Sequence, residues 1–144
     1  VQEIGVCAVE YNAYYTEPEQ RLPISLVVAI AIHESGWGTS RFALEGNNYF
    51  GMKTKSEDPE EYMIPNENKK VRLAKYKTTC SSVYAFMDLL SKSKKYKGFR
   101  EKLMTQWFLD EINYGILIKT LNKYSKDKLW RKSIMKIIEQ IEVK

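Results

Sequence analysis

The sequence predicts an α+β fold that is mainly helical and carries one small β-hairpin lobe. Apolar residues recur at helical spacing along most of the chain, and this spacing is lost between about residues 48 and 77. In that stretch, short segments separated by polar turns favour strands. Because 144 residues are the length of one domain, we expect a single domain over residues 1–144 with a β insertion at about 48–77.

The N-terminal part is expected to hold two helices and one short helical turn. A weak helical pattern runs from Val1 to about Thr16, and EPEQRLP then forms a connection. Pro23 suits the first turn of the second helix. Its apolar run, LPISLVVAIAI, is too hydrophobic for a surface helix and, at about eleven residues, too short to cross a bilayer. This helix ends near Ser35, where GWG allows a sharp turn, and SRFALEG can form one more helical turn.

Short strands are expected next, followed by further helices. NYFGMK, EYMIP and VRLAKY have the pattern of strands, whereas KSEDPEE and PNENKK have the composition of loops. Helical spacing then returns in three apolar stripes, each of which predicts a core-facing helix. The stripes are Val83, Phe86, Met87 and Leu90; Tyr114, Leu117, Ile118 and Leu121; and Trp130, Ile134, Ile137, Ile138 and Ile141.

Composition and charge restrict the class of partner. Hydrophobic residues make up 44% of the chain, which excludes a disordered protein, and no apolar stretch reaches the roughly 20 residues of a membrane span. The net charge of +5 suits an anionic partner. The lysine-rich run KSKKYK resembles a solvated surface more than an arginine-rich nucleic-acid site. We therefore expect no nucleic acid and no membrane span, and bacterial wall polymers are one candidate polyanion. A monomer is a separate expectation.

The two cysteines leave two alternatives open. Cys7 and Cys80 can form a disulfide in an oxidising compartment, or they can be two small buried thiols. Neither cysteine has an evident catalytic partner in the sequence.

Glu34 is the first candidate for chemistry. It follows the apolar helix, where buried carbonyl dipoles and scarce water disfavour a charged carboxylate. A carboxyl group in such a place can donate a proton near neutral pH. The alternative is a surface glutamate that merely follows the helix.

Other chemistries find little support. His33 points about 100° away from Glu34 on a helix, so the two side chains are not expected to work on one proton; we expect a packed, hydrogen-bonded histidine. A single histidine, two distant cysteines and scattered acids lack the spacing of a metal site, and no GxSxG turn is present. We expect no cofactor and no metal.

The segment LPISLVVAIAIHESGWGTSRFALEGNNYFGMK resembles a known family. It is similar to the pattern of the glucosaminidases of glycoside hydrolase family 73, found in autolysins, flagellar wall-penetrating enzymes and phage lysins. The similar features are an apolar helix that starts with proline, followed by ESGWG, TSRFA, GNN and FGMK. The similarity continues more loosely through KYKTTCSSVYAFMDLLSKSKKYKGFR and NKYSKDKLWRKSIMKII. It covers most of the chain after Leu22.

The resemblance implies a lysozyme-like fold in which a helical α-lobe and the β-hairpin lobe flank a glycan groove. It implies peptidoglycan glycan strands as the substrate and Glu34 as the general acid. It further implies action in the cell envelope or outside a bacterial cell, or as a phage virion protein or lysin.

Two more catalytic residues follow from the resemblance. The family often has a second carboxylate in the β-lobe, and Glu67 in IPNEN is the nearest equivalent, with Glu60 and Glu61 as rivals. The family's GYATD-like motif corresponds to KYSKD, which gives Tyr124 the place of an active-site tyrosine. This segment lacks the glycine of the motif.

Substrate contacts are expected from four residues near the glutamate. Trp37, Asn48, Tyr49 and Phe50 are the candidates, although Trp37 and the Gly46-Asn47-Asn48 turn also suit packing. On a strand Tyr49 and Phe50 would face opposite sides, so only one of them would reach the groove. Family members often have Gln where this chain has Ile30, so any polar support from that position is absent.

The resulting prediction is a peptidoglycan hydrolase that cleaves the β-1,4 bond after N-acetylglucosamine. Glu34 would protonate the leaving oxygen, and either water activated by Glu67 or the 2-acetamido group of the substrate would attack the sugar carbon. The alternatives are a muramidase or lytic transglycosylase on the same fold, and an inactive wall-binding or virion module.

Overall fold

The computed structural model describes residues 1–122, 124 and 127–142. Most of this part of the chain is helical, with one antiparallel pair of short strands. The α-helices are α1 (Gln2–Tyr15), α2 (Ile24–Ser35), α3 (Arg41–Gly46), α4 (Thr79–Lys92), α5 (Lys97–Phe108), α6 (Tyr114–Lys119) and α7 (Lys128–Glu142). The strands are β1 (Tyr62–Met63) and β2 (Leu73–Ala74), and the 3₁₀ turns are η1 (Pro18–Gln20), η2 (Pro59–Glu61) and η3 (Lys94–Tyr96).

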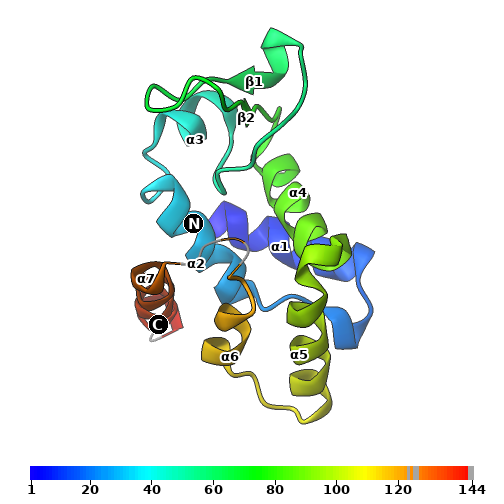
Figure 1. The fold of residues 1–144 in the computed structure, drawn as a ribbon. Coiled ribbons are helices and arrows are strands. Elements are labelled where there is room, and N and C mark those ends of the chain that lie inside the picture. Colours follow the sequence, from blue (N-terminus) through cyan, green and yellow to red (C-terminus); the bar gives the residue numbers. More distant parts are fainter. Residues whose placement is uncertain (123, 125–126, 143–144) are drawn as a thin grey trace.

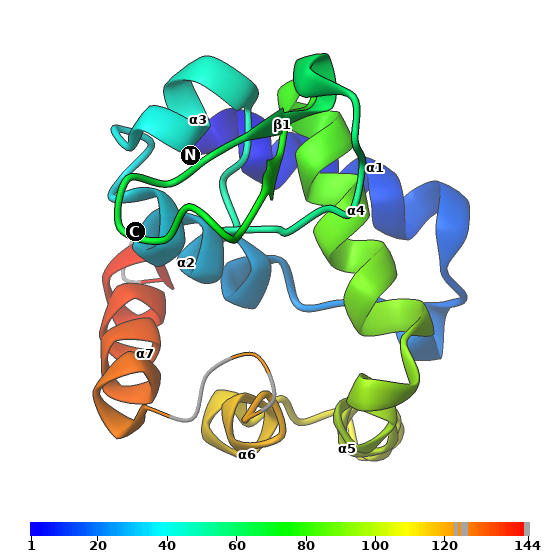
Figure 2. The ribbon, with the colours of Figure 1, turned by 45° about the horizontal axis from the view of Figure 1, so that its top comes forward.

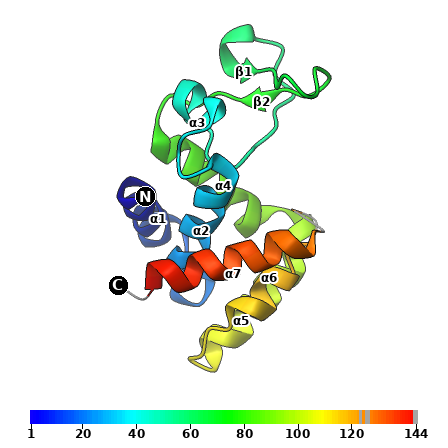
Figure 3. The same ribbon diagram turned by 90° about the vertical axis from the view of Figure 1, so that its left-hand side faces the viewer.

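The helices form one lobe and the strands, with α3, lie at one end of it (Figure 1). Helix α2 lies in the middle, where it packs against α1 on one side and α7 on another (Figure 3). Every residue of α2 from Leu26 to Ile32 is buried, as expected for a helix that is apolar all round. No helix within the described residues has the length and apolar character needed to cross a bilayer.

Local signals explain where several elements begin. Ser40 and Thr78 are the N-caps of α3 and α4. The hydroxyl oxygen of each accepts a hydrogen bond from the amide of the residue three positions later, at 3.1 Å for Ser40 and 3.0 Å for Thr78. Helix α7 buries Trp130, Ile134 and Ile138, four residues apart, so that one face packs on the core. The predicted mainly helical α+β class is thus confirmed.

A disulfide joins the two cysteines. Cys7 on α1 is bonded to Cys80 on α4; their Cα atoms are 5.2 Å apart, and the two residues are 73 positions apart in the sequence. Of the two alternatives left by the sequence, the structure has the disulfide, which ties together two helices that pack closely.

The hairpin lobe, residues 48–77, differs in detail from the prediction. NYFGMK does not form a strand; its contribution to the sheet is one isolated bridge between Lys53 and Leu73. The reason is a tight turn, in which Gly51 has a φ of 69° and is bracketed by hydrogen bonds to Asn48. Helix α5 was not predicted, because its buried residues, Phe99, Leu103 and Gln106, do not form a long apolar stripe.

Candidate active site around Glu34

Glu34 lies in the last turn of α2, immediately before a sharp reversal of the chain. The three residues Gly36, Trp37 and Gly38 have φ values of 57°, 59° and 82°. The amide of Trp37 donates a 2.9 Å hydrogen bond to the carbonyl of Ile32, which closes the helix in the manner of a Schellman motif. Two glycines make this left-handed run sterically accessible; at Trp37 it is unusual for a large side chain.

Ser35 fixes the turn from inside. Its hydroxyl donates to the carbonyl of Ala31 at 2.6 Å and accepts from the amide of Gly38 at 2.9 Å. Its own carbonyl accepts from the amide of Ser40 at 3.0 Å. Because Ser35 is buried and fully bonded, the backbone that carries Glu34 has little freedom to move.

Two distant segments reach the carboxylate of Glu34, which is half-buried. The indole Nε1–H of Trp130, at the start of α7, donates a 2.7 Å hydrogen bond to Oε1. On the other side, the segment after α3 descends to the end of α2 (Figure 2), and a Cβ atom built on Gly51 would lie 3.9 Å from Oε2. One oxygen is therefore held by Trp130, and the other lies beside a residue without a side chain.

Tyr124 belongs to the same cluster. Its hydroxyl donates a hydrogen bond to the carbonyl of Phe50. Burial raises the pKa of Tyr124 well above its ordinary value of 10, and the negative charge of Glu34 adds to the shift. The phenol thus remains protonated and is a hydrogen-bond donor close to the Glu34 carboxylate.

Aromatic rings pack beneath these two groups. Phe50 stacks on Phe86 with ring centroids 4.3 Å apart, and Phe86 meets Tyr124 edge to face at 5.6 Å. Tyr124 in turn packs on Trp130 at 5.7 Å. The result is a continuous aromatic support that fixes the phenol and the indole.

His33 lies beside this support. Its ring packs edge-on to Trp130 at 6.4 Å, so it has a packing contact to the residue that binds Glu34. Among the described residues, no group of three or more histidines, cysteines or acids is placed to hold a metal ion.

Asn48 must be corrected from a substrate contact to a structural residue. It is 1% exposed. Its amide nitrogen donates to the carbonyls of Met52 and Ala74, both at 2.9 Å, and its amide oxygen accepts from the amides of Met52 and Phe50. All its hydrogen-bonding groups are thus used to hold the turn at Gly51 against the sheet.

The expected choice between Tyr49 and Phe50 is resolved by burial. Phe50 is 1% exposed, inside the core, so its expected contact with the substrate is also corrected. Tyr49 is half-buried. A contact with substrate in this segment is therefore available to Tyr49, while Phe50 supports the site from below.

Trp37 is well exposed. Its side chain is 58% accessible in the turn directly after Glu34. An aromatic face held on a rigid turn can stack on the apolar face of a sugar.

The candidate second carboxylates lie in the hairpin lobe. Glu67 is exposed in the loop between β1 and β2, and Glu60 and Glu61 belong to η2. Glu61 accepts a 2.8 Å hydrogen bond from the hydroxyl of Ser56. No hydrogen bond among the described residues joins any of these three acids to Glu34.

Trp130 and Gly51 are parts of the site that the sequence did not reveal. Trp130 belongs to an apolar stripe that indicates only a buried helix face. Gly51 is a glycine of the kind found in many turns, and nothing in the sequence around it indicates a place beside Glu34. Their proximity to Glu34 depends on contacts across 96 and 17 positions of the chain, which no local pattern encodes.

Comparison with known proteins gives a family and a fold. Residues 11–143 match the family model Glucosaminidase, described as mannosyl-glycoprotein endo-β-N-acetylglucosaminidase. Protein bax of Escherichia coli (strain K12) is 32% identical over 106 residues, which are 72% of this chain; the chain spans 37% of the length of that protein.

Two solved structures have a similar fold. The peptidoglycan hydrolase from Sphingomonas sp. A1 matches with a TM-score of 0.69 and 18% identity, over 96% of this chain and 87% of that one. The glycoside hydrolase domain of Salmonella typhimurium FlgJ matches with a TM-score of 0.68 and 17% identity, over 99% and 86%. At such identities the likeness concerns the fold.

Proposed function

The chain belongs to the glucosaminidase family and is a glycoside hydrolase; from this premise we propose that it cleaves the β-1,4 bond after N-acetylglucosamine in peptidoglycan. The family description supports the sugar on the glycone side of the bond. Peptidoglycan as the polymer is supported by the fold shared with a peptidoglycan hydrolase. The net charge of +5 also suits an anionic wall.

Glu34 is the general acid in this proposal. The observation that carries it is the pair of neighbours at its carboxylate: Trp130 holds Oε1, and Gly51 leaves the space beside Oε2 without a side chain. Oε2 can thus present a proton to the oxygen of the leaving sugar. Transfer of that proton neutralises the alkoxide as the glycosidic bond breaks.

Two routes can complete the reaction. In one, Glu67 removes a proton from a water molecule that attacks the sugar carbon, and the configuration is inverted. In the other, the 2-acetamido oxygen of the substrate attacks and the configuration is retained. Tyr124, a neutral donor near Glu34, can orient either nucleophile if its hydroxyl exchanges the carbonyl of Phe50 for the substrate or water.

Tyr49 and Trp37 are the proposed sugar contacts. Both are accessible, and both lie within 15 residues of Glu34 on the rigid chain that follows it. In this proposal the enzyme acts on the wall as a monomer. It is located in the bacterial cell envelope, is secreted, or is a phage protein.

Product analysis tests the proposal. Purified walls are digested and the soluble fragments are reduced and identified by mass spectrometry. Reducing-end N-acetylglucosamine is expected. Reducing-end muramic acid would instead identify a muramidase, anhydro-muramic ends a lytic transglycosylase, and no release by a folded protein an inactive wall-binding module.

A further inference from the structure

A cationic hollow lies on the hairpin lobe, apart from the Glu34 cluster. Its volume is about 580 Å³, and its charged lining residues are Lys55, Lys69, Lys70 and Arg72. The ring of Tyr62 also lines it, and no carboxylate does. A hollow of this size is within the range of small-ligand sites.

The positive charges of this hollow are not neutralised within the described part of the protein. The ion pairs there join Arg41 to Glu45, and two further pairs lie on α4 and α5. None involves the four cations of the hollow. Like charges gathered in one place repel one another, and a bound anion relieves this repulsion.

Arg72 is held in place for binding. Its guanidinium lies 4.9 Å from the centre of the Tyr62 ring, and its Nη1 donates a 3.1 Å hydrogen bond to the carbonyl of Ser56. Its Nε and Nη2 groups have no hydrogen-bond partner among the described residues. A fixed guanidinium with free N–H groups suits the paired oxygens of a carboxylate or phosphate.

The hollow is on the face of the hairpin that turns away from α3. Side chains alternate between the two faces of a strand. Met63 is buried and packs against Gly46 of α3, which places its neighbour Tyr62 on the opposite face, with Arg72 stacked on it. The hollow is thus separate from the packing that positions the loop at Glu34.

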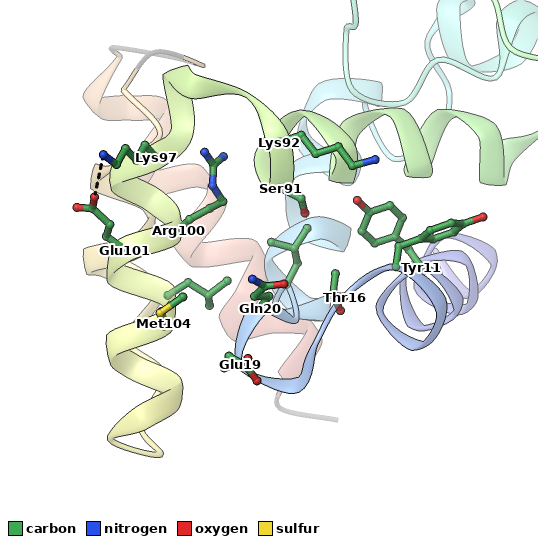
Figure 4. Close-up of a pocket in the computed structure, with 13 residues that line it drawn as sticks. Tyr11, Thr16, Glu19, Gln20, Ser91, Lys92, Lys97, Arg100, Glu101 and Met104 are labelled. Carbon is green, nitrogen blue, oxygen red and sulfur yellow. Dashed lines mark ion pairs between the residues drawn. The ribbon is translucent and has the colours of Figure 1, made fainter.

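Another hollow shows that lysine and arginine alone do not make such a site. It has a volume of about 520 Å³ and lies between the end of α1 and α5 (Figure 4). There Lys97 pairs with Glu101 at 3.9 Å, and Lys92 pairs with Asp88 at 3.1 Å. Arg100 donates to two backbone carbonyls. Its cations are therefore already satisfied by the protein, unlike those of the hairpin hollow.

We propose that the hairpin hollow binds an anionic group, a carboxylate or a phosphate, of the wall polymer whose glycan is cleaved at Glu34. This inference rests on the proposed function, since that function brings the wall to the hairpin lobe. Peptide carboxylates and phosphate-containing wall polymers share the required chemistry. Binding there anchors the enzyme on the polymer without taking part in bond cleavage.

The test measures binding of Glu34→Gln protein to insoluble walls by sedimentation at low and high salt. The hollow is altered by Lys69→Gln with Lys70→Gln, and a matched control carries Lys94→Gln with Lys95→Gln, which removes the same charge from an exposed 3₁₀ turn elsewhere. Two wall preparations are compared, one with and one without attached phosphate polymers. Since this assay needs no turnover, it remains informative even if the hydrolase proposal fails.

The hollow variant is expected to bind about tenfold more weakly at low salt, equivalent to about 1.4 kcal/mol, and the control to bind normally. A loss confined to phosphate-containing walls identifies phosphate, and an equal loss on both preparations identifies carboxylate. When the lysine substitutions of the hollow are placed in the protein that retains Glu34, turnover of an uncharged chitin oligosaccharide should equal that of the wild type. Four results would each overturn the inference. The first two are unaltered binding by the hollow variant and equal losses in the hollow and control variants. The others are no wall binding by the parent protein and a lower kcat of the hollow variant on the neutral oligosaccharide.

Discussion

Trp130 and Glu34 are 96 residues apart in the sequence, and a 2.7 Å hydrogen bond joins the indole nitrogen of one to the carboxylate of the other. This bond links the first turn of α7 to the last turn of α2. It determines which carboxylate oxygen remains available beside Gly51, and the proposed proton transfer depends on it.

Replacement of Glu34 by Gln tests the acid directly. The amide oxygen of Gln can still accept the hydrogen bond from Trp130, but no transferable proton remains. Wall lysis should fall by at least about 10²–10⁴-fold, while the melting temperature stays equal to that of the wild type or rises slightly. A turbidity assay and a thermal melt on the same preparation check both. Lysis at wild-type rates would rule out the acid role, and an unfolded variant would make Glu34 a structural residue.

Trp130→Phe removes the donor and keeps most of the aromatic packing. Loss of this hydrogen bond leaves Oε1 of Glu34 without its partner and should lower the free energy of unfolding by about 1–3 kcal/mol. Misplacement of Glu34 should lower kcat by about 10–100-fold. The matched control is Trp107→Phe, since the Nε1–H of Trp107 donates a 2.7 Å bond to the carbonyl of Arg21, away from Glu34. The control should lose stability and retain kcat. Equal kcat losses in the two variants would argue against a positioning role for Trp130.

Glu67→Gln distinguishes the two catalytic routes. If Glu67 activates water, its replacement should reduce turnover far more than Glu60→Gln or Glu61→Gln, and nuclear magnetic resonance of the fresh product should show an inverted anomer. Retention with an active Glu67→Gln variant would instead assign the attack to the acetamido group. An inactive Glu60 or Glu61 variant beside an active Glu67 variant would transfer the role to that neighbour.

Stability should fall at high pH because buried tyrosines resist ionisation in the folded state. Burial raises the pKa of Tyr11 and of Tyr114 to about 12, and raises that of Tyr124 well above 10. The unfolded chain releases these protons near pH 10 (about the ordinary value), so the stabilisation is complete below that pH and is lost as the pH rises through the folded pKa values. Urea unfolding at several pH values should show this decline. Tyr124→Phe should make the decline of stability with pH shallower, whereas replacement of the exposed Tyr14 by Phe should not. Identical slopes in the wild type and both variants would contradict a contribution of Tyr124 to this decline.

The disulfide should contribute to stability and not to chemistry. Cys7→Ser or Cys80→Ser opens a link that spans 73 positions, and the chain-entropy model assigns about 4 kcal/mol to a loop of that order. Lysis per folded molecule should be nearly unchanged, because neither sulfur lies among the residues around Glu34. Treatment of the wild type with a reductant should lower its melting temperature to that of the variants. Loss of lysis with folding intact would assign the thiols a catalytic role.

The resemblance to the glucosaminidase family, which the block around ESGWG carried, is confirmed by the family match. Helix α2 was also predictable, because an apolar run, Pro23 and two glycines act over a few residues. The strand expected at NYFGMK was wrong, since alternating residues alone do not reveal that the side chain of Asn48 accepts hydrogen bonds from the amides of Phe50 and Met52, on both sides of Gly51.

The sequence by itself determined the helix that carries Glu34 and the turn that follows it, because hydrophobic periodicity and glycine conformation are local properties. Only the tertiary structure decided that Trp130 binds one carboxylate oxygen, that Gly51 lies beside the other and that Cys7 reaches Cys80. These contacts join segments that approach each other only when α1, α4 and α7 pack around α2. Their geometry is therefore a property of the assembled core, and no single stretch of sequence contains it.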